Sequence, residues 1–279
     1  MRTLKTLPGF SLNIVALALL SAFGSAYAEE DVAALARPDS SVSVGAAGVT
    51  NSSKDRSFFG QYSGLRREDG YLLLDLDFIK RDDATGTWTT LQGRDLGLET
   101  REIRFGQQKQ GDWKYSFEYN EMVRHDPRTI NSSLVGAGSN APVVSRLATA
   151  GSGDELNLEL KRKNTTVAVE KWLSNSLQFE ASFRNEDKNG ARMFGNGFQC
   201  TSGAAPSPVC PASGTQWALL MLPEPINSTT QQFEAKLNYS TEKLMLSGGY
   251  YGSFYNNQFT SMGATINGTD TYRISGDRG

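Results

Sequence analysis

The chain has 279 residues, 28 basic and 30 acidic side chains, and a formal net charge of −2, a balance that argues against a nucleic-acid partner. Glycine is frequent at 28 residues and aromatics make up 10%, while helix-period patterns of useful length are absent, so the chain is expected to be β-rich. One histidine and two cysteines exclude c-type haem attached to this chain, because each attachment needs Cys-x-x-Cys-His, and they give no support to a zinc site.

The N-terminus has the features of a secretory signal peptide over residues 1–28. Arg2 and Lys5 form a basic start, residues 12–23 are mostly apolar, and Ala26-Tyr-Ala28 is a small-x-small cleavage site. No other stretch approaches the ~20 apolar residues of a transmembrane helix. We therefore expect a mature chain from Glu29, with a short periplasmic segment over residues 29–40.

Alternation with a period of two predicts antiparallel strands from residue 41 onward. In the first half, strands are expected at 41–49, 71–81, 87–97, 99–107 and 113–123, with a loop at 50–70, a tight turn at 82–86 and a hairpin turn at Gly111-Asp112. The strand at 113–123 is the most informative. It places four aromatics, Trp113 to Tyr119, on one face and polar residues on the other, which favours a barrel wall in lipid over a soluble core.

The second half repeats the pattern around two long polar segments. Strands are expected at 155–161, 165–173, 176–187, 231–240 and 243–253, with long loops at 125–153 and 189–216. The alternation changes phase near Lys163-Asn164, which predicts a bulge or turn there. The segment Leu222-Pro-Glu-Pro-Ile226 precedes the strand at 231–240.

Short turns thus alternate with long loops along about ten strands, as in bacterial barrels whose short turns face the periplasm. The predicted fold is all-β, a transmembrane antiparallel up-and-down β-barrel over residues 41–279. A soluble antiparallel sheet with one wet face would give the same alternation in any single hairpin. No tight repeat suggests a propeller or solenoid.

Charged residues of both signs alternate with the apolar positions and are expected to face the lumen. The candidates are Asp75, Asp77, Arg94, Glu102, Arg104, Lys114, Glu118, Glu180, Arg184, Glu234 and Lys236. Two interpretations remain open for them. They can form a solvated wall held by cross-strand pairs, or a polar surface that docks something inside the barrel.

His125 and the two cysteines are the remaining candidates for chemistry. His125 lies in Arg124-His-Asp-Pro-Arg128 at a strand end, where no nucleophile is placed near it, so a loop histidine is expected in place of a catalytic one. Cys200 and Cys210 lie in one long loop, and in an oxidising compartment they predict a disulfide. Closing that loop would stabilise the fold by roughly 2–3 kcal/mol.

Eight separate stretches of the chain carry a family resemblance. They are Phe59-Gly-Gln-Tyr-Ser-Gly-Leu65, Leu73-Leu-Asp-Leu-Asp77, Lys80-Arg-Asp-Asp-Ala-Thr-Gly-Thr-Trp88, Gly93-Arg-Asp-Leu-Gly-Leu98, Gln110-Gly-Asp-Trp113, Phe183-Arg-Asn-Glu-Asp-Lys-Asn-Gly190, Leu222-Pro-Glu-Pro-Ile226 and Tyr250-Tyr-Gly-Ser-Phe-Tyr-Asn256. Together they resemble the MtrB/PioB family of decahaem-associated outer-membrane proteins. The resemblance implies a non-enzymatic, porin-like sheath in the outer membrane. Such a sheath houses a periplasmic multihaem c-type cytochrome of the decahaem type, whose haems carry electrons across the membrane, and the sheath itself binds no cofactor.

The chain departs from the family in two respects. About ten strands are too few for a barrel that holds a folded protein, since ~16–18 strands already go with an aqueous channel, so an N-terminal portion or a truncated member is expected. The mature N-terminus also lacks the Cys-x-x-Cys that some family members carry. The alternative function is a general diffusion porin for ions or small solutes. A barrel enzyme is the third class, against which the single histidine argues.

Overall fold

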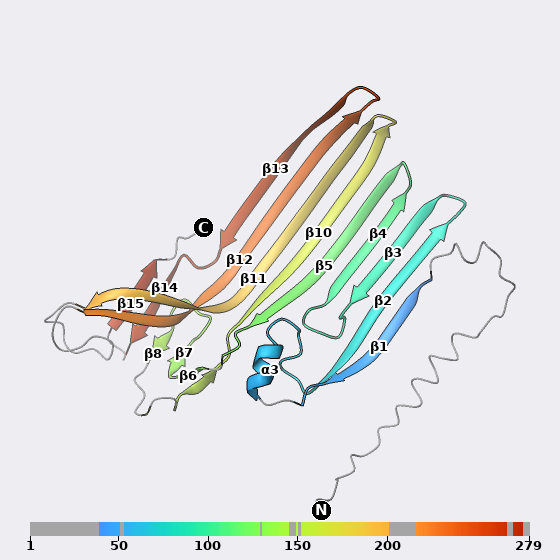
Figure 1. Ribbon diagram of the computed structural model, residues 1–279. Helices are drawn as coiled ribbons and strands as arrows, with labels where there is room; N and C mark the ends of the chain where they lie inside the picture. Colours follow the sequence, from blue (N-terminus) through green and yellow to red (C-terminus); the bar gives the residue numbers. More distant parts are fainter. Residues whose placement is uncertain are drawn as a thin grey trace, which may run out of the picture. The chain divides into compact units, whose positions relative to one another are not determined.

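The computed structural model describes residues 39–50, 53–128, 130–144, 149, 152–200, 216–266 and 270–275. Most of them belong to one antiparallel sheet of nine strands in the order β1-β2-β3-β4-β5-β10-β11-β12-β13, so neighbours along the chain are neighbours in the sheet (Figure 1). The strands are β1 (Ser41–Gly48), β2 (Gly70–Asp82), β3 (Thr87–Arg94), β4 (Glu102–Lys109), β5 (Trp113–His125), β10 (Glu159–Ser174), β11 (Leu177–Cys200), β12 (Gln216–Ser240) and β13 (Met245–Asn257). The predicted all-β, up-and-down topology is confirmed.

The pairing register places most of the apolar residues of the nine strands on one face. One row runs directly across five strands through Phe105, Phe117, Val167, Phe183 and Phe233. We call the apolar belt the following residues on this face: Val42, Val44, Leu72, Leu74, Leu76, Phe78, Leu91, Ile103, Phe105, Tyr115, Phe117, Tyr119, Val167, Val169, Phe179, Ala181, Phe183, Phe233, Ala235, Leu237, Tyr239, Leu246, Tyr250 and Phe254.

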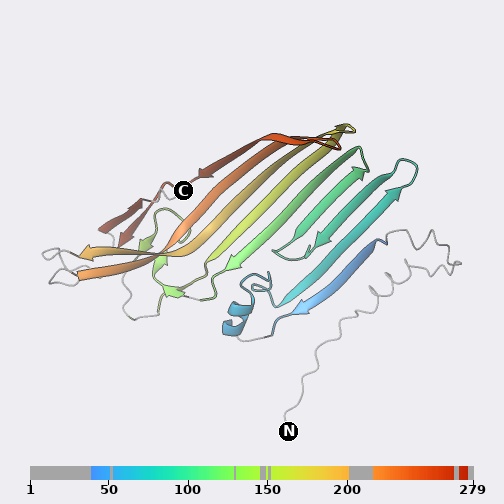
Figure 2. The same cartoon turned by 45° about the horizontal axis from the view of Figure 1, so that its top comes forward.

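The apolar belt is not a core, because no second layer formed by the described residues covers it. Val44, Leu72 and Tyr250 are 53%, 56% and 65% exposed, and none of the buried apolar side chains in the described ranges belongs to the belt. Figure 2 shows the main strands side by side in a single layer. On β2 and β12 the belt runs from Leu72 to Phe78 and from Phe233 to Tyr239, about 20 Å at ~3.4 Å per residue. Uncovered apolar surface of this extent, close to the ~25 Å band of outer-membrane barrels, is suited to lipid.

The two ends of the sheet differ in how the strands are joined. Tight turns join β2 to β3, β4 to β5, β10 to β11 and β12 to β13 at one end, which we call the turn end. Gly86 and Gly111 adopt φ of 66° and 73° in two of these turns, a conformation that favours glycine. The longer connections gather at the opposite end, the loop end, so the predicted alternation of short turns and long loops is confirmed.

The loop end carries the remaining elements. The helix α3 (Ser53–Phe59) lies between β1 and β2, and β6 (Ile130–Ser132) pairs with β9 (Asp154–Leu156). A second sheet has the order β15-β14-β8-β7, from β7 (Leu134–Val135), β8 (Val143–Val144), β14 (Ser261–Ile266) and β15 (Asp270–Ser275). A small core of Leu222, Met262 and Ala264, with Leu134 against it, joins this sheet to β12. No helix in the described part is long and apolar enough to cross a membrane.

Three expectations for the strands were wrong in detail. The predicted loop at 189–216 begins as strand, because β11 and β12 stay paired as far as Cys200 and Gln216. The predicted bulge at Lys163-Asn164 is absent; β10 runs unbroken there, and its irregularity lies between Trp172 and Ser174. The change of phase has another cause: Leu158 is buried before β10 begins, whereas Val167 lies on the belt. The predicted loop at 50–70 also contains the short helix α3.

Candidate functional site: the polar face of the sheet

The polar face is the side of the nine-stranded sheet opposite the apolar belt. The register places all eleven predicted lumen residues on it, two or fewer per strand, from Asp75 and Asp77 on β2 to Glu234 and Lys236 on β12. The strand pairing therefore shows that the eleven residues share one face of the sheet. The lumen that this face is expected to line stays a prediction.

Ion pairs between neighbouring strands bring predicted residues together in two parts of the polar face, at β2–β3 and at β11–β12. Arg94 on β3 lies 3.4 Å from the Asp77 carboxylate on β2, which also accepts a 3.5 Å hydrogen bond from Gln92. Lys236 on β12 lies 3.3 Å from Glu180 on β11, and the Asn238 amide donates to the same carboxylate at 2.6 Å. These are the cross-strand contacts expected of a solvated wall.

The middle of the polar face is joined by amides that the sequence analysis did not single out. The Asn164 amide on β10 donates to the Asn120 amide oxygen on β5 at 2.9 Å. Arg184 on β11 donates to the Asn164 oxygen at 3.3 Å and pairs with Glu186 at 3.4 Å. The period-two alternation that selects Glu118 and Arg184 also selects Asn120 and Glu186, so the signal was present in the sequence.

The other predicted residues are placed as follows. Asp75 accepts a 2.9 Å hydrogen bond from the backbone N–H of Asp95, whose φ of 51° is unusual for a residue other than glycine, so Asp75 stabilises an irregular backbone. Arg104 pairs with Glu102 of its own strand and lies opposite Glu118 in register. Lys114 pairs with Glu170, which the sequence analysis missed, at 3.2 Å. Glu234 lines a shallow hollow together with Glu180 and Lys236.

These ion pairs contribute little to stability, and their value lies in the surface they form. The Lys236 and Glu180 side chains are 37% and 34% exposed, and Arg94 is 49% exposed, so each pair is worth about 0–1 kcal/mol. Both signs are interspersed, which gives a hydrated wall without a strong field. Among the described residues no three His, Cys, Asp or Glu side chains are grouped so as to hold a metal ion.

His125 lies in a charged cluster at the loop end that sequence reasoning did not find. It is the last residue of β5 and 4% exposed, so the expectation of a loop histidine is wrong. Its Nδ1 lies 3.4 Å from Glu159 and its Nε2 lies 3.6 Å from Glu99. We call the His125 cluster these three residues with Arg67, which contacts both carboxylates, and Lys161, 2.8 Å from Glu99.

The His125 cluster lies beyond the apolar belt, which ends on β5 at Tyr119. Burial lowers the pKa of His125 below its ordinary value, with Arg66 and Arg67 acting in the same direction and Glu159 and Glu99 opposing it. Burial would raise the pKa of Glu99, but the hydrogen bond from Lys161 and the charges of Arg67, Lys161 and His125 outweigh it, so that pKa is lowered. At neutral pH the cluster therefore holds a neutral imidazole beside the ionised carboxylate of Glu99.

The His125 cluster joins the segment after α3 to the ends of β5 and β10. The backbone N–H of His125 donates to the Gln61 carbonyl at 2.9 Å, and the Arg66 guanidinium donates to the Asp126 carbonyl. The side-chain partners Glu99 and Glu159 come from the β3–β4 connection and the start of β10. The histidine therefore holds loops together, and its surroundings offer no arrangement for nucleophilic catalysis.

The predicted disulfide stays a prediction. Cys200 is the last residue of β11, and Cys210 lies outside the described residues. The predicted signal peptide and the periplasmic segment up to residue 38 also lie outside them.

Comparison with known proteins gives two matches. The family described as "Putative outer membrane beta-barrel porin, MtrB/PioB" matches residues 51–273. "Outer membrane protein MtrB" of Shewanella baltica (strain OS185) is 22% identical over 200 residues, which cover 68% of this chain and 26% of that protein. The chain thus spans about a quarter of the length of the curated relative that it matches.

Proposed function

Because the chain belongs to the MtrB/PioB family of outer-membrane β-barrel porins, we propose that it forms part of a sheath for a periplasmic multihaem c-type cytochrome. The haems of that partner carry electrons across the outer membrane, and this chain supplies the wall around them. The proposal depends on one observation above all. A continuous polar face, wide enough to span nine strands, lies opposite an equally continuous apolar belt.

The wall would act as an insulator and a scaffold. Lipid contacts the apolar belt, and the partner lies against paired charges and amides such as Asp77–Arg94 and Glu180–Lys236. A surface of this kind can contact a folded protein through water and hydrogen bonds without binding any one group tightly. The chain needs no cofactor of its own in this role, since the partner carries the haem. Export would depend on removal of residues 1–28 as a signal peptide.

A general diffusion porin is the second candidate function. The same wall with an empty lumen would conduct ions, and the mixed charges of the polar face favour neither sign strongly. The family is one of porins, and we propose no enzymatic activity, because His125 is buried between two carboxylates at the loop end.

One experiment separates the two functions. The full gene is expressed together with a multihaem c-type cytochrome gene of the same genome, and the affinity-tagged chain is purified from the outer membrane in mild detergent. Haem absorbance in a fixed ratio to the chain is expected for a sheath. A haem-free preparation that conducts ions in planar bilayers when reconstituted alone would contradict the sheath and support the diffusion porin.

A further inference from the structure

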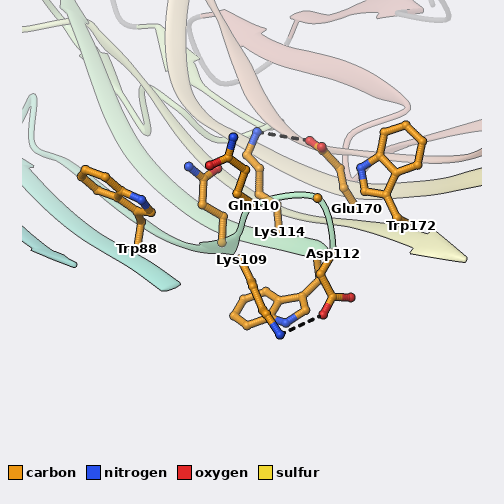
Figure 3. A pocket seen from close by; sticks show the side chains of 10 residues that line it. Trp88, Lys109, Gln110, Asp112, Lys114, Glu170 and Trp172 are labelled. Atoms are coloured by element: carbon orange, nitrogen blue, oxygen red, sulfur yellow. Dashed lines mark hydrogen bonds and ion pairs between the residues drawn. The ribbon is translucent and has the colours of Figure 1, made fainter. Parts of the chain in front are cut away.

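Three of the four tryptophans of the chain surround one open hollow at the turn end. Trp88 of β3, Trp113 of β5 and Trp172 of β10 line it together with the β4–β5 turn, including Gln110 and Asp112 (Figure 3). Tryptophan is a rare residue with a large contact surface, so its concentration at one place calls for a physical reason.

Contact with the membrane accounts for the position of one of these tryptophans but not for the positions of the other two. Trp113 lies on the belt side and stacks on Tyr115 with ring centroids 4.9 Å apart, as expected of the aromatic girdle at the membrane–water interface. Trp88 and Trp172 lie on the polar face, opposite the side of the sheet that is suited to lipid. Trp172 is still 37% exposed, so this indole is left partly uncovered on a face whose other side chains are mostly polar.

The polar groups between Trp88 and Trp172 are already paired. In register, Trp88 is followed by Gln108, Lys114 and Glu170 on successive strands, and Lys114 and Glu170 lie 3.2 Å apart. Figure 3 shows this pair between the two indoles. The Arg81 guanidinium lies over the Trp88 ring at 5.3 Å. Because these charges already have partners, the hollow has little net charge and offers the planar surfaces of the indoles between polar groups.

We propose that Trp88 and Trp172 are docking anchors for a surface loop of the sheathed periplasmic protein, a loop with apolar or aromatic side chains. The inference rests on the proposed sheath function, because the turn end faces the periplasm in bacterial barrels and the partner enters from there. Three strand spacings of ~4.8 Å separate β3 from β10, and Trp172 lies two residues, ~7 Å, beyond the register position of Trp88, so the anchors stand about 16 Å apart, enough for one polypeptide segment between them. Exposed tryptophan is the residue type most enriched among interface hot spots.

The test uses the full chain produced with its partner and compares three variants. W88A/W172A removes both anchors, W88F/W172F keeps aromatic surface, and Y239A removes an aromatic side chain of the apolar belt near the turn end of β12, away from the hollow. Haem retained per chain is followed during washing of the immobilised complex, after heat-modifiable gel mobility has shown that each barrel is folded. Because a hot-spot residue is worth at least about 2 kcal/mol, W88A/W172A is expected to release the partner on the order of thirtyfold faster.

Each outcome decides the matter. Faster release by W88A/W172A, restored in large part by W88F/W172F and absent in Y239A, supports the anchors. Equal release by W88A/W172A and the wild-type chain overturns the inference while the sheath function stands. A wild-type chain that carries no haem at all overturns the sheath function and the anchors with it.

Discussion

His125 is buried among charged residues that lie far from it in the sequence. The sequence around His125 does not indicate which residues contact it, because these residues come from distant segments. They are Arg67, Glu99 and Glu159. The Nε2 atom of His125 is buried without a hydrogen bond, since Glu99 is 3.6 Å away. Burial is the main reason that the pKa of His125 is lowered, and the charges of Arg66 and Arg67 act in the same direction.

Acidification is therefore expected to loosen the loop end in two steps. The unfolded segment takes up a proton on His125 below pH ~6.5, before the folded one does, so local stability falls as the pH drops through the folded pKa of His125. The lowered pKa of Glu99 adds a second loss, beginning below pH ~4.5, when its carboxylate is protonated. Hydrogen exchange of residues 60–69 in the purified barrel, measured from pH 7.5 to 4, checks both steps.

The variant His125→Gln provides the control for this pH dependence. It keeps a polar side chain of similar size but removes the titration, so the first step should vanish and the second should remain. A first step of unchanged size in His125→Gln would show that another group is responsible.

Gly97 lies so close to the main chain of β2 that only glycine fits at this position. A Cβ built there would lie 2.0 Å from the carbonyl oxygen of Leu72, a main-chain atom that cannot move aside without disturbing β2. Gly97→Ala is expected to destabilise the barrel by roughly 1–3 kcal/mol, as overpacking does. Urea unfolding in lipid, followed by heat-modifiable mobility, measures the loss. Gly248→Ala is the matched control, because nothing lies within 4 Å of its Cβ position, and an equal loss there would contradict the steric explanation.

Each strand carries apolar side chains on its belt face and mostly polar side chains on the other face. On β5, Phe117 lies in the middle of the apolar belt, with Phe105 and Val167 beside it, while its neighbour Ser116 points to the polar face. The two positions are one residue apart, so any difference between them reports the face and not the depth in the membrane.

Phe117→Arg is expected to destabilise the barrel by about 2–4 kcal/mol, because a cation at the bilayer midplane loses its hydration. Ser116→Arg is expected to cost less than about 1 kcal/mol, since its side chain reaches water on the polar face. Unfolding in lipid bilayers with urea compares the two variants. Equal losses would mean that both faces are wet, and the membrane assignment of the belt would have to be abandoned.

Local alternation explains why the strands could be predicted and where prediction failed. Leu72 to Phe78 and Trp113 to Tyr119 repeat with a period of two because one face meets lipid, and this pattern is visible in any short window. The start of the segment 189–216 contains Gly190, Gly195 and Gly197, which composition assigns to a loop, yet β11 and β12 continue pairing there. Nothing local shows that a partner strand is present, and the same is true of the contacts that bury His125.

At the scale of the whole molecule, the sheet has two sides with different neighbours and two ends with different connections. The described part of β1 pairs only with β2, and that of β13 only with β12. Edges of this kind must find partners in a membrane, because lipid offers no hydrogen bonds to backbone groups. The chain spans about a quarter of its curated relative, whose additional length is sufficient for more strands. The wall described here is then one sector of the proposed sheath.

The orientation of this sector follows from its two ends and can be measured in whole cells. Short turns of bacterial barrels face the periplasm and long loops face outward, so Ala137, between β7 and β8, should lie outside and Asn175, in the β10–β11 turn, inside. Ala137→Cys and Asn175→Cys are made in a chain whose Cys200 and Cys210 are replaced by serine. A membrane-impermeant maleimide should label only Ala137→Cys until the outer membrane is permeabilised. The reverse pattern would place the turn end outside, and the tryptophan anchors would then face away from any periplasmic partner.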